Sequence, residues 1–285
     1  MSIELKNINH TYMKNTPFEK TALKNINLRI NDREYLAIAG HTGSGKSTLI
    51  QLMAGLMAPT SGNVLIDNID LSAKDKSSVR QARLKVGIVF QYPETQLFEE
   101  TVEKDIAFGP RNLNLNESEI NERIEEAMKL VSLPETVKTI SPFNLSGGQK
   151  RKVAIAGVLA MKPKYLILDE PTAGLDPRSR DEMMNNIQRL HNEQGVTIIL
   201  ISHSMDDIAK FAGRVVILSQ GNIIADDAPD KIFCKNDILK AAGLLPPSAT
   251  QLLIALKSNG LNINTNAITI DEAEQIISSG KILRE

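Results

Sequence analysis

A glycine-rich stretch, GHTGSGKS at residues 40–47, constrains the fold of this chain more than any other feature. A short β-prone run, YLAIAG at 35–40, precedes it. The run that follows has apolar residues at helical spacing, namely Leu49, Leu52, Met53 and Leu56. Strand, glycine loop and helix in this order are the context of a phosphate-binding loop, or P-loop. We therefore predict an α/β fold in which this loop joins a buried strand to a helix.

The residue types in this loop suit a bound nucleotide. Gly40 and Gly45 allow the backbone to wrap around a phosphate. Lys46 can reach the β- and γ-phosphates, and the Ser47 hydroxyl can ligate magnesium. The alternative, an incidental glycine-rich turn, leaves the flanking strand and helix unexplained. The predicted nucleotide-binding residues of the loop are Gly40, His41, Thr42, Gly43, Ser44, Gly45, Lys46, Ser47 and Thr48.

A pair of acidic residues ends the apolar run YLILDE at 165–170. Asp169, at the end of a buried strand, can hold the magnesium of a P-loop hydrolase through water. Glu170 beside it is the candidate base that orients or deprotonates an attacking water. Such a pair can also be a solvated end of a strand, but its coexistence with a P-loop favours the catalytic interpretation.

The charge balance argues against a nucleic-acid partner. The chain has 33 Lys and Arg against 34 Asp and Glu, whereas binding through phosphate neutralisation needs a basic face. The single cysteine, Cys234, cannot form an internal disulfide, which fits a reducing compartment.

The amino terminus, MSIELKNINH, alternates apolar and polar residues, so it predicts a half-buried strand and not a signal peptide. The longest apolar runs, such as VTIILIS at 196–202, are far shorter than the roughly 20 residues that cross a bilayer. If the protein works at a membrane, we expect it to dock onto the helices of another protein.

From residue 116 the pattern predicts helices. Asn116 can cap a helix with Glu119 at the reciprocal capping-box position, and the apolar stripe that follows is Ile120, Ile124, Ala127 and Val131. Further helices are expected from near Ser146 and over 179–193, strands over 165–170 and 196–203, and a hairpin over 215–227. The tail from about 229 predicts short helical pieces, the last starting at Asp271.

A second glycine-containing stretch, LSGGQ at 145–149, stands about a hundred residues after the first cradle. The P-loop, LSGGQ and LDEP in this order, with Gln91 between the first two and His203 after the last, resembles the ATP-binding-cassette (ABC) ATPases. The resemblance covers residues 1 to about 225. It implies a P-loop NTPase fold with a RecA-like core, an antiparallel β subdomain and a helical subdomain, and it implies ATP and Mg²⁺ as cofactors.

In that family two cassettes stack head to tail, so LSGGQ serves the nucleotide of the other subunit. The resemblance implies that Ser146, Gly147 and Gly148 contact the γ-phosphate held by the partner's P-loop, and Gln149 is counted with them among the nucleotide-binding residues. A helix amino terminus suits this role because it offers N–H groups and the positive end of the helix dipole.

The resemblance also implies roles for single residues. Gln91 would reach magnesium and the attacking water, His203 would contact the γ-phosphate, and Asp176 would lie at the dimer seam. Together with Ser47 and Asp169, Gln91 makes up the implied magnesium set, and with Glu170 and His203 it makes up the catalytic set. For adenine stacking we favour Tyr12, with Phe18 as the competitor.

The stretch FQYPETQLFEETVEKDIAFGPRN at 90–112, with PFEKTAL at 17–23 and DEPTAGLDP at 169–177, resembles one branch of that family. This branch is the ATPases of energy-coupling factor (ECF) transporters, and within it the second, A-prime (CbiO-like) paralogue. It implies a heterodimer of homologous ATPases, a transmembrane coupling protein and an exchangeable substrate-binding membrane subunit. The expected location is the cytoplasmic face of the cell membrane, as a peripheral protein.

We expect an ATPase domain over 1–228, with its helical subdomain at about 92–160, and a small helical carboxy-terminal extension for dimerisation over 229–285. DPRSR at 176–180 departs from the family pattern, which has glycine at its fourth position. The alternatives are the ATPase of a conventional homodimeric ABC transporter, a soluble ABC ATPase acting on DNA or ribosomes, and a non-catalytic regulatory subunit. The cargo, a vitamin or a metal ion, stays open because an ATPase subunit does not touch it.

Overall fold

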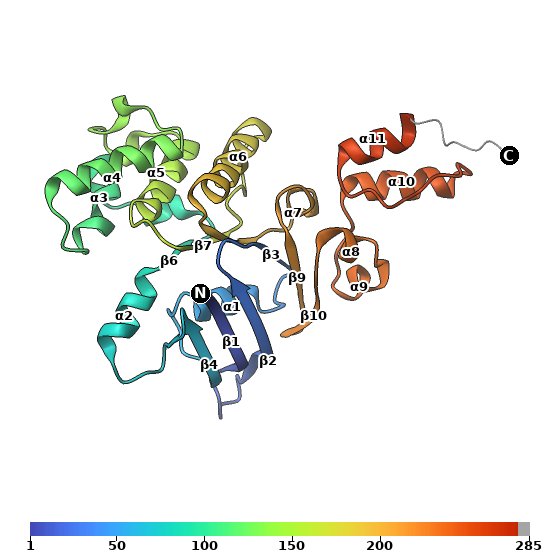
Figure 1. The fold of residues 1–285 in the computed structure, drawn as a ribbon, viewed down its shortest axis with the longest axis horizontal. Helices are drawn as coiled ribbons and strands as arrows, with labels where there is room; N and C mark the ends of the chain where they lie inside the picture. The colour runs from blue at the N-terminus through green and yellow to red at the C-terminus, as the bar shows by residue number, and fades with distance from the viewer. Residues whose placement is uncertain (279–285) are drawn as a thin grey trace. The chain divides into compact units, whose positions relative to one another are not determined.

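The computed structural model describes residues 1–278, which form two compact units (Figure 1). One, which we call the mid-chain unit, consists of Met1 and Ile69–Ile199. The other, the terminal unit, consists of Ser2–Asn68 and the chain from Leu200 onwards. The last seven residues of the expected extension, 279–285, lie outside the described residues.

The terminal unit begins with an antiparallel sheet. Strand β1 (Ser2–Tyr12) pairs with β2 (Lys20–Asn31) on one side and with β4 (Ser61–Ile66) on the other (Figure 1). The alternating residues Ile3, Leu5 and Ile8 are buried. The prediction of a half-buried amino-terminal strand is therefore confirmed.

A second group of strands in the same unit carries the P-loop. Strand β3 (Tyr35–Ala39) is buried along its whole length and runs parallel to β9 (Arg214–Ser219), which pairs antiparallel with β10 (Asn222–Asp227). Helix α1 (Lys46–Met53) starts directly after the glycine loop. The predicted strand, loop, helix order and the predicted hairpin are both confirmed.

The predicted apolar stripe of α1 is wrong at its last residue. Leu49, Leu52 and Met53 are buried, but Leu56 is 61% exposed. The helix ends earlier than the stripe assumed because Gly55 adopts a left-handed φ of 67°. The Leu56 amide then bonds back to the Gln51 carbonyl at 2.9 Å, which closes the helix in the manner of a glycine cap.

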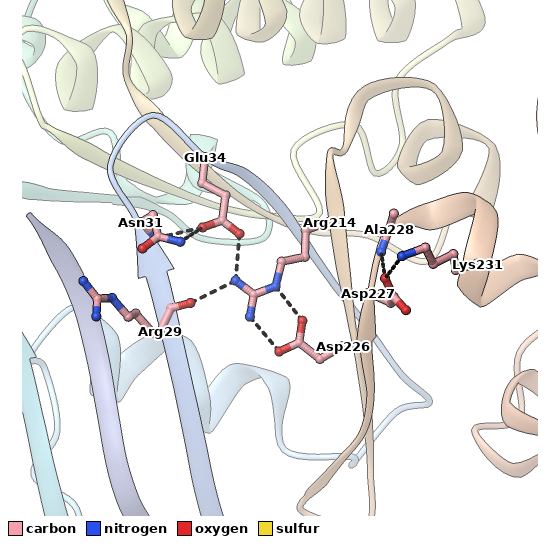
Figure 2. Close-up of polar contacts among 8 residues, drawn as sticks. All are labelled: Arg29, Asn31, Glu34, Arg214, Asp226, Asp227, Ala228 and Lys231. Carbon is pink, nitrogen blue, oxygen red and sulfur yellow. Dashed lines mark hydrogen bonds and ion pairs between the residues drawn. The ribbon is translucent and has the colours of Figure 1, made fainter.

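Arg214 ties the start of β9 to its neighbours (Figure 2). Its guanidinium makes two bonds to the Asp226 carboxylate on β10, at 2.5 and 2.6 Å. It also bonds to the Glu34 carboxylate at 2.8 Å and to the Arg29 carbonyl at 2.9 Å. The hydrogen bonds that the guanidinium donates to Asp226 hold the pKa of Arg214 above its usual range. One side chain thus links the β2–β3 turn to the β9–β10 hairpin.

Short helices follow the hairpin. Helices α7 (Met205–Phe211), α8 (Pro229–Phe233) and α9 (Asn236–Ala241) pack around Phe233 and Ile208 against β3 and β9. Helices α10 (Ser248–Ser258) and α11 (Ile270–Ser278) share a small core built on Leu253 and Ala267. The predicted tail of short helices is confirmed, and its last described helix starts one residue before the expected Asp271.

The mid-chain unit contains a parallel strand pair, β6 (Val86–Val89) and β7 (Tyr165–Asp169). It also contains β5 (Ile69–Asp70), helix α2 (Lys76–Leu84) and the long helix α6 (Pro177–Gln194). Strand β8 (Thr197–Ile201) crosses the boundary at Ile199, so its last two residues belong to the terminal unit.

Between β6 and β7 every element is helical. These elements are η1 (Pro93–Gln96), α3 (Val102–Arg111), α4 (Glu117–Leu130), η2 (Glu135–Val137), η3 (Pro142–Asn144) and α5 (Gly147–Leu159). Helices α3, α4 and α5 pack on one another (Figure 1). The predicted capping box of Asn116 and Glu119 is present, and the predicted stripe of α4 is buried. Within residues 1–278, no helix has both the length and the hydropathy needed to span a bilayer.

Candidate functional site

The P-loop has a backbone that only glycine accommodates at two positions. A Cβ added to Gly40 (φ 155°) would lie 2.2 Å from the Leu218 carbonyl oxygen. One added to Gly45 (φ 112°) would lie 2.7 Å from the carbonyl oxygen of Ala22. The close approach of β2 and β9 to the loop therefore dictates these glycines, and the loop is held in shape by its neighbours.

The start of α1 fits a phosphate. Its N-cap, Gly45, has no side-chain cap among the described residues, so the positive end of the helix dipole is left to an external anion. The Lys46 ammonium lies across the loop, 2.6 Å from the Gly40 carbonyl oxygen and 3.1 Å from that of His41. The Ser44 hydroxyl is buried without a hydrogen-bond partner in the described chain, and the Ser47 side chain is exposed.

The hairpin between β9 and β10 supports the loop, a contact that motif reasoning missed. The Gly221 amide donates to the Ser44 carbonyl at 3.0 Å, and the Lys24 amide donates to the Gly221 carbonyl at 2.8 Å. Gln220 and Gly221 both have left-handed φ angles, 49° and 80°. The sequence signal for this turn was the QG pair at 220–221, but the pattern gave no sign that the turn touches the P-loop.

Both aromatic candidates for adenine stacking lie in the terminal unit. The Tyr12 hydroxyl is 3.0 Å from the Thr48 hydroxyl of α1, and the ring packs edge-on against His10 at 4.7 Å between centroids. Tyr12 is 37% exposed and Phe18 is 78% exposed. Tyr12 is thus anchored beside the P-loop, which supports its selection over Phe18.

His203, which follows β8, is electrostatically coupled to the P-loop. Partial desolvation of its ring, and secondly the positive charge of Lys46, lower the pKa of His203 below its usual 6.5. The imidazole is therefore neutral at pH 7, with one ring nitrogen as a hydrogen-bond acceptor and the other as a donor. Lys46 and His203 both belong to the terminal unit, and the charge of Lys46 reaches the His203 ring.

The acidic pair lies at the end of a buried strand, as expected. Asp169 is the last residue of β7 and is half-buried. Glu170 follows with a left-handed φ of 51°, an uncommon angle for a side chain of this kind. Its carbonyl accepts from the Ala173 amide at 3.1 Å, so Glu170 begins a tight turn. Gln91, two residues after β6, is exposed in the same unit.

The LSGGQ stretch forms the capped start of α5. The Ser146 hydroxyl accepts from the Gln149 amide at 3.3 Å, and the Gln149 side chain accepts from the Ser146 amide at 3.1 Å. A Cβ on Gly147 or on Gly148 would meet nothing within 4 Å among the described atoms. Packing among the described residues therefore does not require glycine at these two positions.

Asp176 caps the next helix. Its carboxylate accepts from the Ser179 amide at 3.1 Å at the start of α6. Hydrogen bonding from the Ser179 side chain, and then from the backbone of that residue, lowers the pKa of Asp176. Serine at this fourth position, the departure noted in DPRSR, thus gives the Asp176 carboxylate an additional donor.

The chain was compared with known proteins. Residues 23–173 match the family model described as ABC transporter. The energy-coupling factor transporter ATP-binding protein EcfA2 of Clostridium tetani is 55% identical over 276 residues, which cover 96% of both chains. That of Clostridium perfringens is 52% identical over 278 residues, 97% of both. The chain belongs to the ABC transporter ATPase family. Within it, the chain groups with the ECF ATP-binding proteins, so it is an ATP-binding and ATP-hydrolysing subunit of that class of transporter.

Solved structures agree with the ABC ATPase fold. The structure of cbiO1 from Clostridium perfringens, described as part of the ABC transporter complex cbiONQ, has a TM-score of 0.73 and 39% identity. It covers 84% of this chain and 92% of its own. The cassette MJ0796, a dimer bound to ADP and phosphate after hydrolysis, has a TM-score of 0.71 and 32% identity over 80% of this chain and 98% of its own. The predicted fold class is confirmed.

Proposed function

We propose that this ECF-class ATPase pairs with a second, homologous ATPase beneath a transmembrane coupling protein and powers uptake of a micronutrient, a vitamin or a metal ion. An exchangeable membrane subunit captures that cargo. The observation that carries the pairing is the open start of α5, where a Cβ added to Gly147 or Gly148 would meet no other atom within 4 Å among the described residues. The near full-length identity to ECF ATP-binding proteins supports the transporter class.

In this proposal the terminal unit binds the phosphates of ATP. The glycine loop wraps them, Lys46 donates to the β- and γ-phosphates, and Tyr12 stacks on adenine. The anchoring of Tyr12 to Thr48 and the uncapped start of α1 support these roles. His203, kept neutral, contacts the γ-phosphate and positions the water.

Magnesium would be held by Ser47, Gln91 and Asp169. These residues fit the ion because a hydroxyl, an amide oxygen and a carboxylate are the hard oxygen donors that it prefers. When bound, magnesium neutralises negative charge that develops on the phosphates. Glu170 takes the proton of the attacking water, or orients that water for attack on the γ-phosphate.

The signature at the start of α5 acts on the nucleotide of the other ATPase. Ser146 and the amides of Gly147 and Gly148 can approach a phosphate because no Cβ stands in the way. Asp176, exposed at the start of α6, lies at the seam between the two ATPases in this proposal. ATP thereby holds the two subunits together.

A groove in the mid-chain unit receives the coupling protein. It has a volume of about 470 Å³, and its walls include the exposed pair Phe98 and Phe108, whose rings meet edge to face at 4.9 Å. Gln96 and Leu97, from the segment that follows Gln91, form part of the same wall. We assign the groove to a cytoplasmic helix of the coupling protein. The reason is that the segment with Gln96 and Leu97 connects the groove wall directly to the proposed hydrolytic residue Gln91. The chain would thus lie at the cytoplasmic face of the membrane as a peripheral protein.

The extension over 229–285 would help to hold the two ATPases together, leaving 1–228 as the ATPase domain with its helical subdomain at about 92–160. Its described part supports this role because α10 and α11 keep apolar side chains at the surface: Leu252, Ile254, Ile270 and Ile277. Such side chains favour a protein partner.

The cycle follows from differential binding. ATP binds the closed pair of ATPases better than the open pair, so it shifts the population towards closure, and hydrolysis reverses the shift. Closure moves the two grooves, and with them the helices docked there.

The test is a detergent-extracted purification of the tagged full chain from its own cells, with co-purifying proteins identified by mass spectrometry. The proposal predicts a second, different ATPase of the family together with a multi-span protein. Recovery of this ATPase alone with membrane proteins would instead indicate a conventional homodimeric transporter. Ribosomal or DNA-bound partners without a membrane protein would contradict the transport function.

A further inference from the structure

A buried arginine beyond the signature joins three segments of the mid-chain unit. Arg151, on the second turn of α5, is only 3% exposed. Its Nε and Nη2 atoms each donate to the Glu94 carboxylate at 3.1 Å, so the pair is bidentate. Its Nη1 atom donates to the carbonyl of Ala173 and, at 3.5 Å, to that of Pro171.

Such a residue is expensive to bury. A cation in the interior loses its hydration. An apolar side chain of similar volume often gives the folded state at least as much stability. Burial also disfavours the charged form of Glu94, but hydrogen bonding and the charge of Arg151 outweigh it, so the pKa of Glu94 is lowered. The Glu94 carboxylate is therefore ionised at neutral pH, where it faces the Arg151 guanidinium. The arrangement calls for a role other than packing.

The contacts of Arg151 fall beside two proposed hydrolytic residues. Glu94 lies on η1, three residues after Gln91. Pro171 and Ala173 belong to the turn that Glu170 begins. Helix α5, on which Arg151 is carried, packs directly on η1.

Both of these places have a strained backbone. Glu170 has φ 51°, and Tyr92, directly after Gln91, has φ 56°. The guanidinium carbon of Arg151 also lies 5.9 Å from the centroid of the Tyr92 ring. Residues other than glycine keep left-handed angles where their surroundings hold them there, at a cost in free energy. The Arg151 side chain contacts the surroundings of both.

We propose that Arg151, together with Glu94, is a positioning residue for ATP hydrolysis. It fixes the turn of Glu170 relative to the segment after Gln91. This inference rests on the proposed roles of Glu170 and Gln91. Gln96 and Leu97 at the end of η1 also line the groove. Movement of a helix docked in the groove would therefore be passed through η1 and Arg151 to the turn of Glu170.

The experiment compares Arg151→Met, Arg151→Lys and Glu94→Gln with the control Lys152→Met. Lys152 is the next residue on the same helix and pairs at 2.8 Å with Glu182, which lies on α6. In the purified transporter complex, ATP affinity and the rate of single-turnover ATP cleavage at this chain's site are measured with Mg²⁺ present. Hydrogen exchange of residues 170–175 is followed in the same samples.

Because Arg151→Met should misplace Glu170, we expect it to slow cleavage about tenfold to a hundredfold. The Kd for ATP should stay within about twofold of the native value. Arg151→Lys, which keeps the charge but cannot span all the partners, should fall between. Glu94→Gln should slow cleavage in the same direction, and the double variant should be no slower than Arg151→Met alone. Faster exchange at 170–175 should accompany the loss.

Other outcomes separate the possible failures. If the native complex cleaves no ATP, the proposed function fails. Native cleavage together with unchanged cleavage by correctly folded Arg151→Met overturns the positioning role alone. Equal losses of ATP affinity and cleavage, or an equal loss in Lys152→Met, would show general destabilisation of α5 and would also overturn it.

Discussion

Among single residues, Lys46 sets the charge at the phosphate site. Its ammonium is buried against the carbonyls of its own loop and lowers the pKa of His203. A buried cation held by carbonyl oxygens is prepared to exchange them for the stronger phosphate oxygens. Partial desolvation, with the same charge as the second cause, keeps His203 neutral.

Replacing Lys46 with alanine should therefore cost ATP affinity. Charged hydrogen bonds are worth about 1.5–3 kcal/mol, which corresponds to roughly a tenfold to hundredfold rise in Kd. A titration with a fluorescent ATP analogue measures this directly. Native affinity in a folded Lys46→Ala chain would remove Lys46 from phosphate binding.

The charge coupling makes a second prediction, for His203. In the folded chain its pKa lies below 6.5, so the stability linked to this group is present above pH 6.5 and is lost as the pH falls through the folded-state pKa. Lys46→Met should raise the His203 pKa towards 6.5. NMR titration of the imidazole protons, assigned with His203→Gln, measures it, and an unchanged value in Lys46→Met would contradict the coupling.

At the scale of elements, the P-loop depends on the β9–β10 hairpin. The Gly221 amide holds the Ser44 carbonyl, and a Cβ at Gly221 would lie 2.7 Å from the Ala22 carbonyl oxygen. The hairpin turn is therefore part of the support of the nucleotide site.

Gly221→Ala should disturb both stability and nucleotide binding. We expect a loss of about 1–3 kcal/mol from the left-handed backbone, with a further loss of ATP affinity because the loop shifts. Gly260→Ala is the control, since Gly260 also has a left-handed φ, 91°, but a Cβ there meets nothing within 4 Å. Urea unfolding and ATP titration of both variants are the measurements. Unimpaired ATP binding in Gly221→Ala would refute the supporting role of the turn.

Local patterns predicted the elements well because their causes are local. The capping box at Asn116 and the alternation in β1 are read from neighbouring residues. The end of α1 was missed because the stripe was extended through Gly55, whose left-handed angle closes the helix. Here a glycine cap overrode periodicity.

For the whole molecule, the sequence predicted the fold and the motif residues but not the contacts that join them. Motif residues can be found because each lies in a short characteristic stretch. Arg151 and Glu94 are 57 residues apart, and Arg151 stands in a basic run, KRK, that is typical of a solvated helix face. Its burial depends on η1 and the turn after Glu170, which only the folded chain brings together.

In the proposed pair of ATPases, this chain supplies its own hydrolytic base to one bound ATP. Glu170→Gln in the purified complex tests this role, by acid quenching after a single turnover and counting the ATP that remains bound. We expect native ATP affinity, cleavage at this chain's site at least about a hundredfold slower, and one uncleaved ATP retained per closed complex. Cleavage of all bound ATP at the native rate would remove Glu170 from this role.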